Sequence, residues 1–285
     1  NIEQISESSQ YYGYKFFTDK LVLSLLENLP APGQYHLGPG DELIITMWGD
    51  TELRQKDIIT REGNIFFDKI GLINLVGLEF AEAKSVLKSR FEKVYSSLKG
   101  QNSATTFIEI SLGNLKSINI HFLGEVNNPG VIPIHPFSTV TTGLIQAGGV
   151  SKEGSLRDIK IIRDGETINS IDYYQYFMNG NILNNIRLQN NDVISIPIRK
   201  SEIEITGLVK HPNIYELTKK ETLGDLIRFA GGLKFNASEK VNLKRILPID
   251  YRINENNIFQ NFWIDISEET DIRLINGDRI SIFPL

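Results

Sequence analysis

Hydrophobic and polar positions follow two different periods along this chain. Short apolar runs within residues 43–48, 57–60 and 64–67, and the alternate positions of Ile108 and Ile110, predict strands. Between them apolar residues recur at steps of three and four, which predicts an amphipathic helix from about residue 79 to 97, with an apolar face of Phe80, Ala83, Val86, Leu87, Phe91 and Val94. Residues 35 to about 112 are therefore predicted to form one α+β unit that is rich in strands.

The second half of the chain contains one pattern twice, in gap-free register, 83 residues apart. The pairs are Gly124 with Gly207, Val126 with Val209, Pro129 with Pro212, Val131 with Ile214, Thr139 with Thr222, Val140 with Leu223, Ala147 with Ala230, Gly148 with Gly231, and Gly149 with Gly232. A repeat of this length indicates a duplicated folding unit. Such units build binding or assembly surfaces more often than catalytic centres.

Each copy is predicted to start as a hairpin and to continue into a short helix. The first strands lie at residues 118–124 and 203–207, and Pro129 and Pro212 then fix φ in a turn that leads into a second strand. In the second copy Thr222 can cap the helix, with Asp225 at its third position. The paired glycines end the helices, since glycine reaches a left-handed conformation at little steric cost. No Lys-Ser/Thr follows these glycines, so we interpret them as helix stops rather than a phosphate cradle.

A turn that carries Asp leads into an alternating apolar strand at three places in the chain. Asp192 precedes Ile194 and Ile196, Asp278 precedes Ile280 and Ile282, and Asp41, which follows Gly38 and Gly40, precedes Leu43 and Ile45. The equivalent positions favour a local Asx-type turn for all three carboxylates over an acid/base set. The offset between the copies has grown to 86 residues here, which predicts a three-residue insertion in the loop-rich region 250–270.

Composition excludes several classes of chemistry. The 285 residues include no cysteine, which removes disulfides, thiol nucleophiles and Cys-ligated metals. A net charge of -5 without a long basic run argues against a nucleic-acid partner. The four histidines are dispersed, and no Gly-x-Ser-x-Gly motif is present. We therefore predict no catalytic residue, no metal site and no cofactor.

Aromatic residues gather at two places. Residues 11–17 contain five aromatic side chains ahead of a Pro/Gly cluster at 30–33, which we interpret as a linker, and residues 21–29 suit a short helix. Tyr173, Tyr174 and Tyr176 lie with Phe177 in the middle of the first copy. These three tyrosines are the candidate glycan contacts. The competing interpretation, which we favour, is that they cover the core of their own repeat.

The order of these motifs resembles a known family. Residues 35–43, with Gly38, Gly40 and Asp41, followed by the strand to Trp48, are similar to the start of a polysaccharide export domain, and residues 78–83 are similar to its helix. The two copies, each with Gly-x-Val-x-x-Pro, Ala-Gly-Gly and Asp-x-Ile-x-Ile, resemble SLBB (soluble-ligand-binding β-grasp) domains. The whole resembles Wza-like bacterial outer-membrane polysaccharide export proteins.

The resemblance implies a β-rich α+β protein with a polysaccharide export domain and two tandem β-grasp-like SLBB domains. The expected boundaries are 1–34 for the aromatic segment and linker, 35–115 for the export domain, 116–200 for the first SLBB domain and 201–285 for the second. It also implies a homo-oligomeric ring at the periplasmic face of the outer membrane, which passes polysaccharide, docks on an inner-membrane co-polymerase and catalyses nothing.

The chain lacks a signal peptide, a lipid-acceptor cysteine and a C-terminal amphipathic helix, so we expect it to be a periplasmic fragment whose contact with the outer membrane lies elsewhere. The alternative function is a soluble module that binds a glycan or another ligand in the SLBB grooves. A glycan hydrolase would need two carboxylates across a cleft, and the sequence nominates no such pair.

Overall fold

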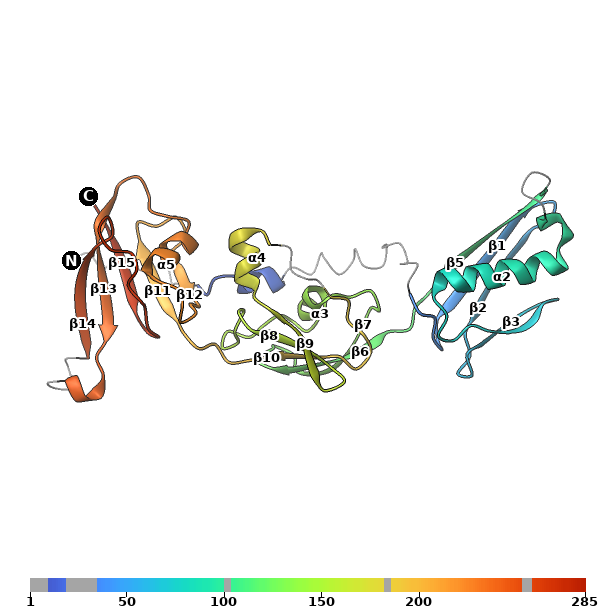
Figure 1. Cartoon of the computed structure of the whole chain (residues 1–285), viewed down its shortest axis with the longest axis horizontal. Helices are drawn as coiled ribbons and strands as arrows, with labels where there is room; N and C mark the ends of the chain where they lie inside the picture. Colours follow the sequence, from blue (N-terminus) through green and yellow to red (C-terminus); the bar gives the residue numbers. More distant parts are fainter. Residues whose placement is uncertain (1–9, 19–34, 100–103, 182–185, 253–257) are drawn as a thin grey trace. The chain divides into compact units, whose positions relative to one another are not determined.

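The computed structural model describes residues 10–18, 35–99, 104–181, 186–252 and 258–285 (Figure 1). The chain divides into two compact units. One contains Val22–Asn119 with Pro133–Ser138, and the other contains Asn1–Leu21, Ile120–Ile132 and Thr139–Leu285. The short helix expected at 21–29 and the linker at 30–33 lie outside the described residues.

The unit that holds residues 35–99 and 104–119 is a small sheet covered by one helix. Strand β1 (Glu42–Gly49) lies between β2 (Leu53–Ile58) and β5 (Thr106–Leu112), and pairs with both in antiparallel orientation. β3 (Asn64–Phe67) and β4 (Gly71–Asn74) form a separate hairpin. The helix α2 (Phe80–Val94) is followed by the 3-10 turn η3 (Ser96–Leu98).

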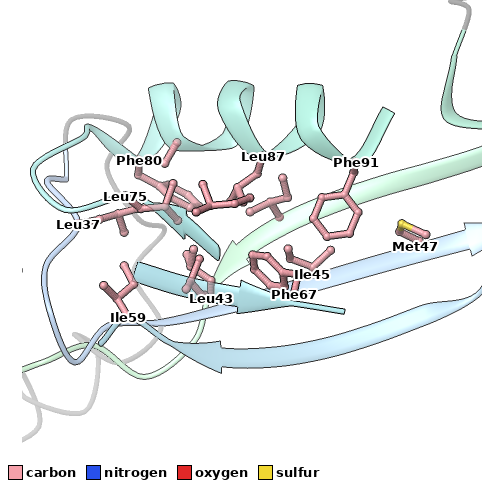
Figure 2. Packing of buried hydrophobic residues seen from close by; sticks show 14 of the residues in the cluster. Leu37, Leu43, Ile45, Met47, Ile59, Phe67, Leu75, Phe80, Leu87 and Phe91 are labelled. Carbon is pink, nitrogen blue, oxygen red and sulfur yellow. The ribbon is translucent and has the colours of Figure 1, made fainter. Parts of the chain in front are cut away.

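The core of this unit lies between the apolar face of the sheet and the apolar face of α2. Leu43, Ile45 and Met47 of β1 point to one side of the sheet, and Leu87 and Phe91 of α2 pack over them (Figure 2). The helix begins at a capping box between Glu79 and Glu82, which satisfies backbone amides that have no partner within the helix.

Two predicted boundaries in this unit are wrong. The helix ends at Val94 rather than near 97, because Tyr95 is extended and the chain then turns into η3. β2 starts at Leu53, ahead of the predicted 57–60. Its residues Arg54, Gln55 and Lys56 pair with β1 although they are polar, so hydrophobicity gives no signal for this strand.

The two copies fold into five-stranded sheets with the same strand order. The first sheet runs β7-β6-β10-β8-β9 and the second β12-β11-β15-β13-β14. In each, the last strand of the copy pairs in parallel with the first. The first copy contains β6 (Ile118–Gly124), β7 (Gly130–Ile134), α3 (Val140–Gln146), β8 (Ile159–Arg163), β9 (Glu166–Ile171), α4 (Tyr173–Asn179) and β10 (Val193–Ile196). The second contains β11 (Ile203–Gly207), β12 (Asn213–Tyr215), α5 (Leu223–Phe229), β13 (Ala237–Ile246), η4 (Ile249–Tyr251), β14 (Phe259–Asp265) and β15 (Arg279–Pro284).

The predicted signals at the ends of the repeat helices are confirmed. Thr222 and Asp225 form a capping box at the start of α5, and Thr139 forms one with Thr142 at the start of α3. Gly148 and Gly149 follow α3 with φ of 82° and 87°, and Gly231 and Gly232 follow α5 with φ of 78° and 86°. The left-handed backbone after each helix explains why both copies keep two glycines there.

The three-residue offset late in the repeat is a net difference rather than one loop insertion. The connection between β13 and β14 spans 247–258, much longer than the two-residue turn between β8 and β9. The first copy instead carries α4 after β9, where the second copy has no helix between Asp265 and Arg279. The second copy thus has a longer β13–β14 hairpin than the β8–β9 hairpin of the first copy, and it lacks the helix that follows β9.

Candidate functional site

The three turn carboxylates occupy the same local geometry in three different sheets. Each accepts a hydrogen bond from the amide three residues earlier: Asp41 from Gly38 at 2.9 Å, Asp192 from Gln189 at 2.8 Å, and Asp278 from Ile275 at 2.8 Å. All three residues are 1% exposed. This geometry explains each of them as the anchor of the turn that leads into its own strand.

The partners of these carboxylates were not predicted. Arg163 donates two hydrogen bonds of 2.8 Å to Asp192, and Arg245 binds Asp278 in the same way, with shortest distances of 2.9 and 2.6 Å. In both copies the arginine also donates to a nearby backbone carbonyl. In the sequence, each arginine stands at or near the end of a strand. The two arginines are 82 residues apart, whereas the rest of the repeat is offset by 83 or 86 residues. Asp41 has no such arginine and accepts instead from the Tyr35 hydroxyl and the Lys116 amide.

The motif glycines and prolines lie at turns and, once in each copy, where two backbone strands approach closely. Gly124 and Gly207 have φ of 78° and 85°, and a Cβ on either would lie 2.0 Å from the carbonyl oxygen of Ile196 or Ile282. Gly40 has a φ of 99°, and the Gly38 amide donates a hydrogen bond to the Asp41 carboxylate. Pro129 and Pro212 stand just before β7 and β12. These residues are explained by the path of the backbone.

The candidate glycan tyrosines do not form an exposed platform. Tyr173 and Tyr174 are 0% and 2% exposed, and only Tyr176, at 38%, retains surface. Tyr173 packs edge-on against Phe17, and Tyr174 against Tyr12 and Phe229. They therefore cover more than their own repeat, because they contact the N-terminal segment and the second copy as well.

The N-terminal aromatic segment, residues 10–18, binds both copies. It extends the edge of β12: the Tyr12 amide donates to Ile214 at 3.0 Å, and the Ile214 amide donates to Gln10 at 2.9 Å. The Tyr12 ring stacks on Tyr215 at 4.9 Å. The 3-10 turn η1 (Tyr14–Thr18) buries Phe17 against Gly149 of the first copy. The aromatic run is evident in the sequence, but its position against both copies is not.

A buried polar network joins the copies directly. Glu216 of the second copy accepts from Ser155 Oγ at 2.7 Å and from the Leu156 amide at 3.0 Å. Burial raises the pKa of the Glu216 carboxyl above its ordinary value, and these two hydrogen bonds offset only part of that effect.

Arg157 is the second part of this network. It donates to Asp172 and Glu221, at 2.8 Å each, and to the Glu216 carbonyl at 2.9 Å, while its guanidinium lies 4.4 Å from the Tyr174 ring centroid. Burial lowers the pKa of Arg157, but the bonds to Glu221 and Asp172 outweigh it, so the group stays charged. The partners lie on both copies, so the network fixes one against the other.

We expect Glu216→Gln to change how the stability of this junction depends on pH. A carboxyl whose pKa is raised on folding binds more protons in the folded state than in the unfolded state. The stability of the fold is therefore fully retained below the unfolded pKa, and part of it is lost as pH rises through the folded pKa. Glu216 therefore lowers the stability of the wild type progressively as pH rises above about 4.5, the ordinary pKa of its carboxyl. Urea denaturation at a series of pH values should show the stability of Glu216→Gln relative to wild type increasing with pH. Glu268→Gln, at an exposed position, should show no trend, and a flat difference for Glu216→Gln would contradict the prediction.

A cavity of roughly 450 Å³ opens beside Glu216. This volume is within the range of small-ligand sites. Its wall is mainly apolar, with hydroxyl, amide and ammonium groups among the lining side chains. The lining residues come from both copies and the link between them: Ser155, Arg157, Asp158, Pro197, Lys200, Ser201, Glu216, Leu217, Thr218, Lys219, Leu274, Ile275 and Asn276.

Two features are absent from the described part of the chain. Among those residues no three His, Cys, Asp or Glu side chains are grouped so that they could hold a metal ion. In the same residues no helix has the length and apolar character needed to cross a membrane.

Comparison with known proteins gives the same order of domains. Residues 29–100 match the polysaccharide biosynthesis/export protein family, and residues 120–172 and 203–257 match the SLBB domain. Two Escherichia coli proteins, each named polysialic acid transport protein KpsD, are 25% identical to this chain over 189 residues. The match covers 66% of this chain but 32% of each relative, so the chain spans about a third of their length. With a polysaccharide export domain followed by two β-grasp-like SLBB domains, the chain belongs to the Wza-like polysaccharide export proteins.

Proposed function

We propose that this chain is the periplasmic part of an outer-membrane channel for capsular or exopolysaccharide, and that it forms part of a ring through which the polysaccharide passes. The observation that carries the proposal is the order of the domains in this chain, an export domain and then two SLBB domains. The similarity to relatives that are named polysialic acid transport proteins supports it. The predicted boundaries, 35–115, 116–200 and 201–285, belong to this proposal.

The junction between the copies supports a structural role. The buried charged side chains of Asp192, Asp278, Arg157 and Glu216 all have partners that hold strands or copies together. Side chains committed in this way are not available for proton transfer to a substrate. We therefore propose that the protein catalyses nothing and that its polysaccharide contacts are weak and repeated, because tight sites would slow passage.

The proposal assigns three partners besides the polysaccharide. Further copies of the chain would complete the ring, an inner-membrane co-polymerase would contact its periplasmic end, and segments outside this sequence would reach the outer membrane. The location that follows is the periplasmic face of the bacterial outer membrane.

A second candidate function is supported by the cavity at the junction. Its volume and mixed lining suit a small soluble ligand or a short glycan, which would make the repeats a binding module. In that case the apolar residues Pro197, Leu217 and Leu274 would contact the ligand, and Ser201 and Thr218 would orient it.

Native mass spectrometry and particle imaging of a longer chain, with its terminal segments restored, should separate the two candidates. We expect closed rings with one dominant subunit number, and only weak retention of oligosaccharides. A persistent monomer that binds an oligosaccharide tightly would contradict the channel and support the binding module.

A further inference from the structure

The sheet of the second copy has one buried face and one exposed face. Ile205, Val241 and Ile282 lie on the buried face and are at most 2% exposed. The residues between them along each strand point to the other side. This outer face crosses β11, β15, β13 and β14, which are neighbours in that order (Figure 1).

A row of directly paired residues on this outer face ends in a tryptophan. Thr206 is paired with Ser281, Ser281 with Asn242, and Asn242 with Trp263. Directly paired residues place their side chains on the same face, about 5 Å apart. Trp263 is 68% exposed, and its ring lies 5.6 Å from that of Phe283, which is 42% exposed. Two aromatic rings therefore stand at the surface beside a row of hydroxyl and amide groups.

We propose that this outer face, with Trp263 as its stacking ring, is a contact surface for hydroxyl-rich saccharide chains. A sugar ring carries slightly positive C–H groups on its face, which suit the negative face of an indole, while its hydroxyls need donors and acceptors. Asn242, which is paired with Trp263, supplies both beside the ring, and Ser281 supplies both on the next strand. Thr206, one strand further, offers a hydroxyl oxygen as an acceptor, while its hydroxyl donates to the Ile280 carbonyl at 3.3 Å. The inference rests on the proposed export function and names a surface along which the polysaccharide makes weak contacts.

The charges around the row favour hydroxyl recognition over a purely ionic contact. Arg279 lies 3.5 Å from Glu204, and Lys244 is placed over the Phe259 ring at 4.2 Å. Asp265 is directly paired with Lys240. The neighbouring rows thus carry both signs of charge, with Arg279 and Lys244 paired directly and the carboxylates of Glu204 and Asp265 beside the cations.

The first copy lacks this surface at the equivalent positions. Its corresponding row is Leu123, Ser195, Lys160 and Ser170, by the same strand pairings. Ser170 stands where the second copy has Trp263. The duplicated fold therefore does not itself require a tryptophan at this position, which argues against a purely structural explanation.

The chain contains two tryptophans, so a single substitution isolates the reporter. In Trp48→Phe, emission comes from Trp263 alone. Titration of the 285-residue chain with a neutral glucose hexasaccharide and with an acidic galacturonate hexasaccharide should blue-shift and saturate this emission, with half-saturation in the millimolar range. Emission from Trp48 in Trp263→Phe should remain unchanged.

Affinity electrophoresis in gels that contain dextran gives a readout that does not depend on fluorescence. Trp263→Ser, which copies the first repeat, should lose at least 5-fold in retardation, whereas Trp48→Phe should not. If serine lowers the melting temperature, Trp263→Leu keeps an apolar side chain without an aromatic face and should lose retardation equally.

Two results would overturn the inference. One is an unchanged Trp263 emission with both hexasaccharides up to their solubility. The other is a blue shift that appears when the protein alone is concentrated, which would assign the face to contact with another copy. Ring formation by the longer chain is measured separately: rings without a saccharide response would reject this surface alone, and saccharide binding by a persistent monomer would reject the channel alone.

Discussion

Gly207→Ala should destabilise the second repeat by about 4 kcal/mol. A residue with a Cβ costs about 1–2 kcal/mol at the positive φ of 85° that this position requires. The new methyl would also lie 2.0 Å from the Ile282 carbonyl oxygen, and overpacking against such a neighbour costs about 1–3 kcal/mol. Because that oxygen belongs to the backbone of β15, the collision can be relieved only by moving the parallel pair β11–β15. Urea denaturation, followed by far-UV circular dichroism, measures the loss.

Gly232→Ala is the matched control. Its φ of 86° is almost the same as that of Gly207, but a Cβ there would meet no atom within 4 Å. It should therefore lose only the backbone part, about 1–2 kcal/mol. Equal losses in the two variants would mean that the approach of Gly207 to β15 is looser than the structure places it.

The order of elements in each repeat could be predicted because its signals are local. The Thr222 cap, the two glycines after α5 and the Asp278 turn each depend on atoms within a few residues of sequence. Such geometry is encoded by the residue types themselves. Helix α4 gave no comparable signal, since its seven residues are mainly aromatic and were interpreted only as a cluster.

Contacts between distant segments could not be predicted in the same way. Residues 10–18 lie about 200 residues from β12, and nothing in their own sequence specifies that strand as the partner of Tyr12. The Arg157 and Glu216 network is similar, because its partners come from both copies. The duplication itself reveals what each copy contains, but the residues that join the copies are the ones that are not repeated.

Sequence also failed to separate buried aromatic residues from exposed ones. Tyr173 and Tyr174 form the densest cluster but are buried by Phe17, Tyr12 and Phe229, all distant in sequence. Trp263 belongs to neither the repeated motifs nor the two aromatic clusters of the sequence. It is nevertheless 68% exposed, because its neighbour Ile264 lies on the buried face of β14. The face of a strand residue depends on the register of the whole sheet, which only the structure fixes.

Arg245→Met should cost the second repeat about 3–5 kcal/mol, the range for removing one partner of a buried ion pair. The Asp278 side chain is 0% exposed and would lose three short contacts with the guanidinium, keeping the single hydrogen bond from the Ile275 amide. The carbonyl of Arg273 would lose its donor as well. We expect a lower urea midpoint with an unchanged slope, since the unfolded state exposes the same surface.

Two further variants test whether the buried charge is the cause. Arg228→Met removes an ion pair with Asp225 whose arginine side chain is 55% exposed, and it should change stability by less than about 1 kcal/mol. In Arg245→Met with Asp278→Asn, the unpaired carboxylate is gone while an amide oxygen still accepts from Ile275, so much of the loss should be recovered. If the double variant is as unstable as Arg245→Met, the arginine stabilises the sheet through the packing of its stem and its bond to the Arg273 carbonyl, and the charge of Asp278 contributes little.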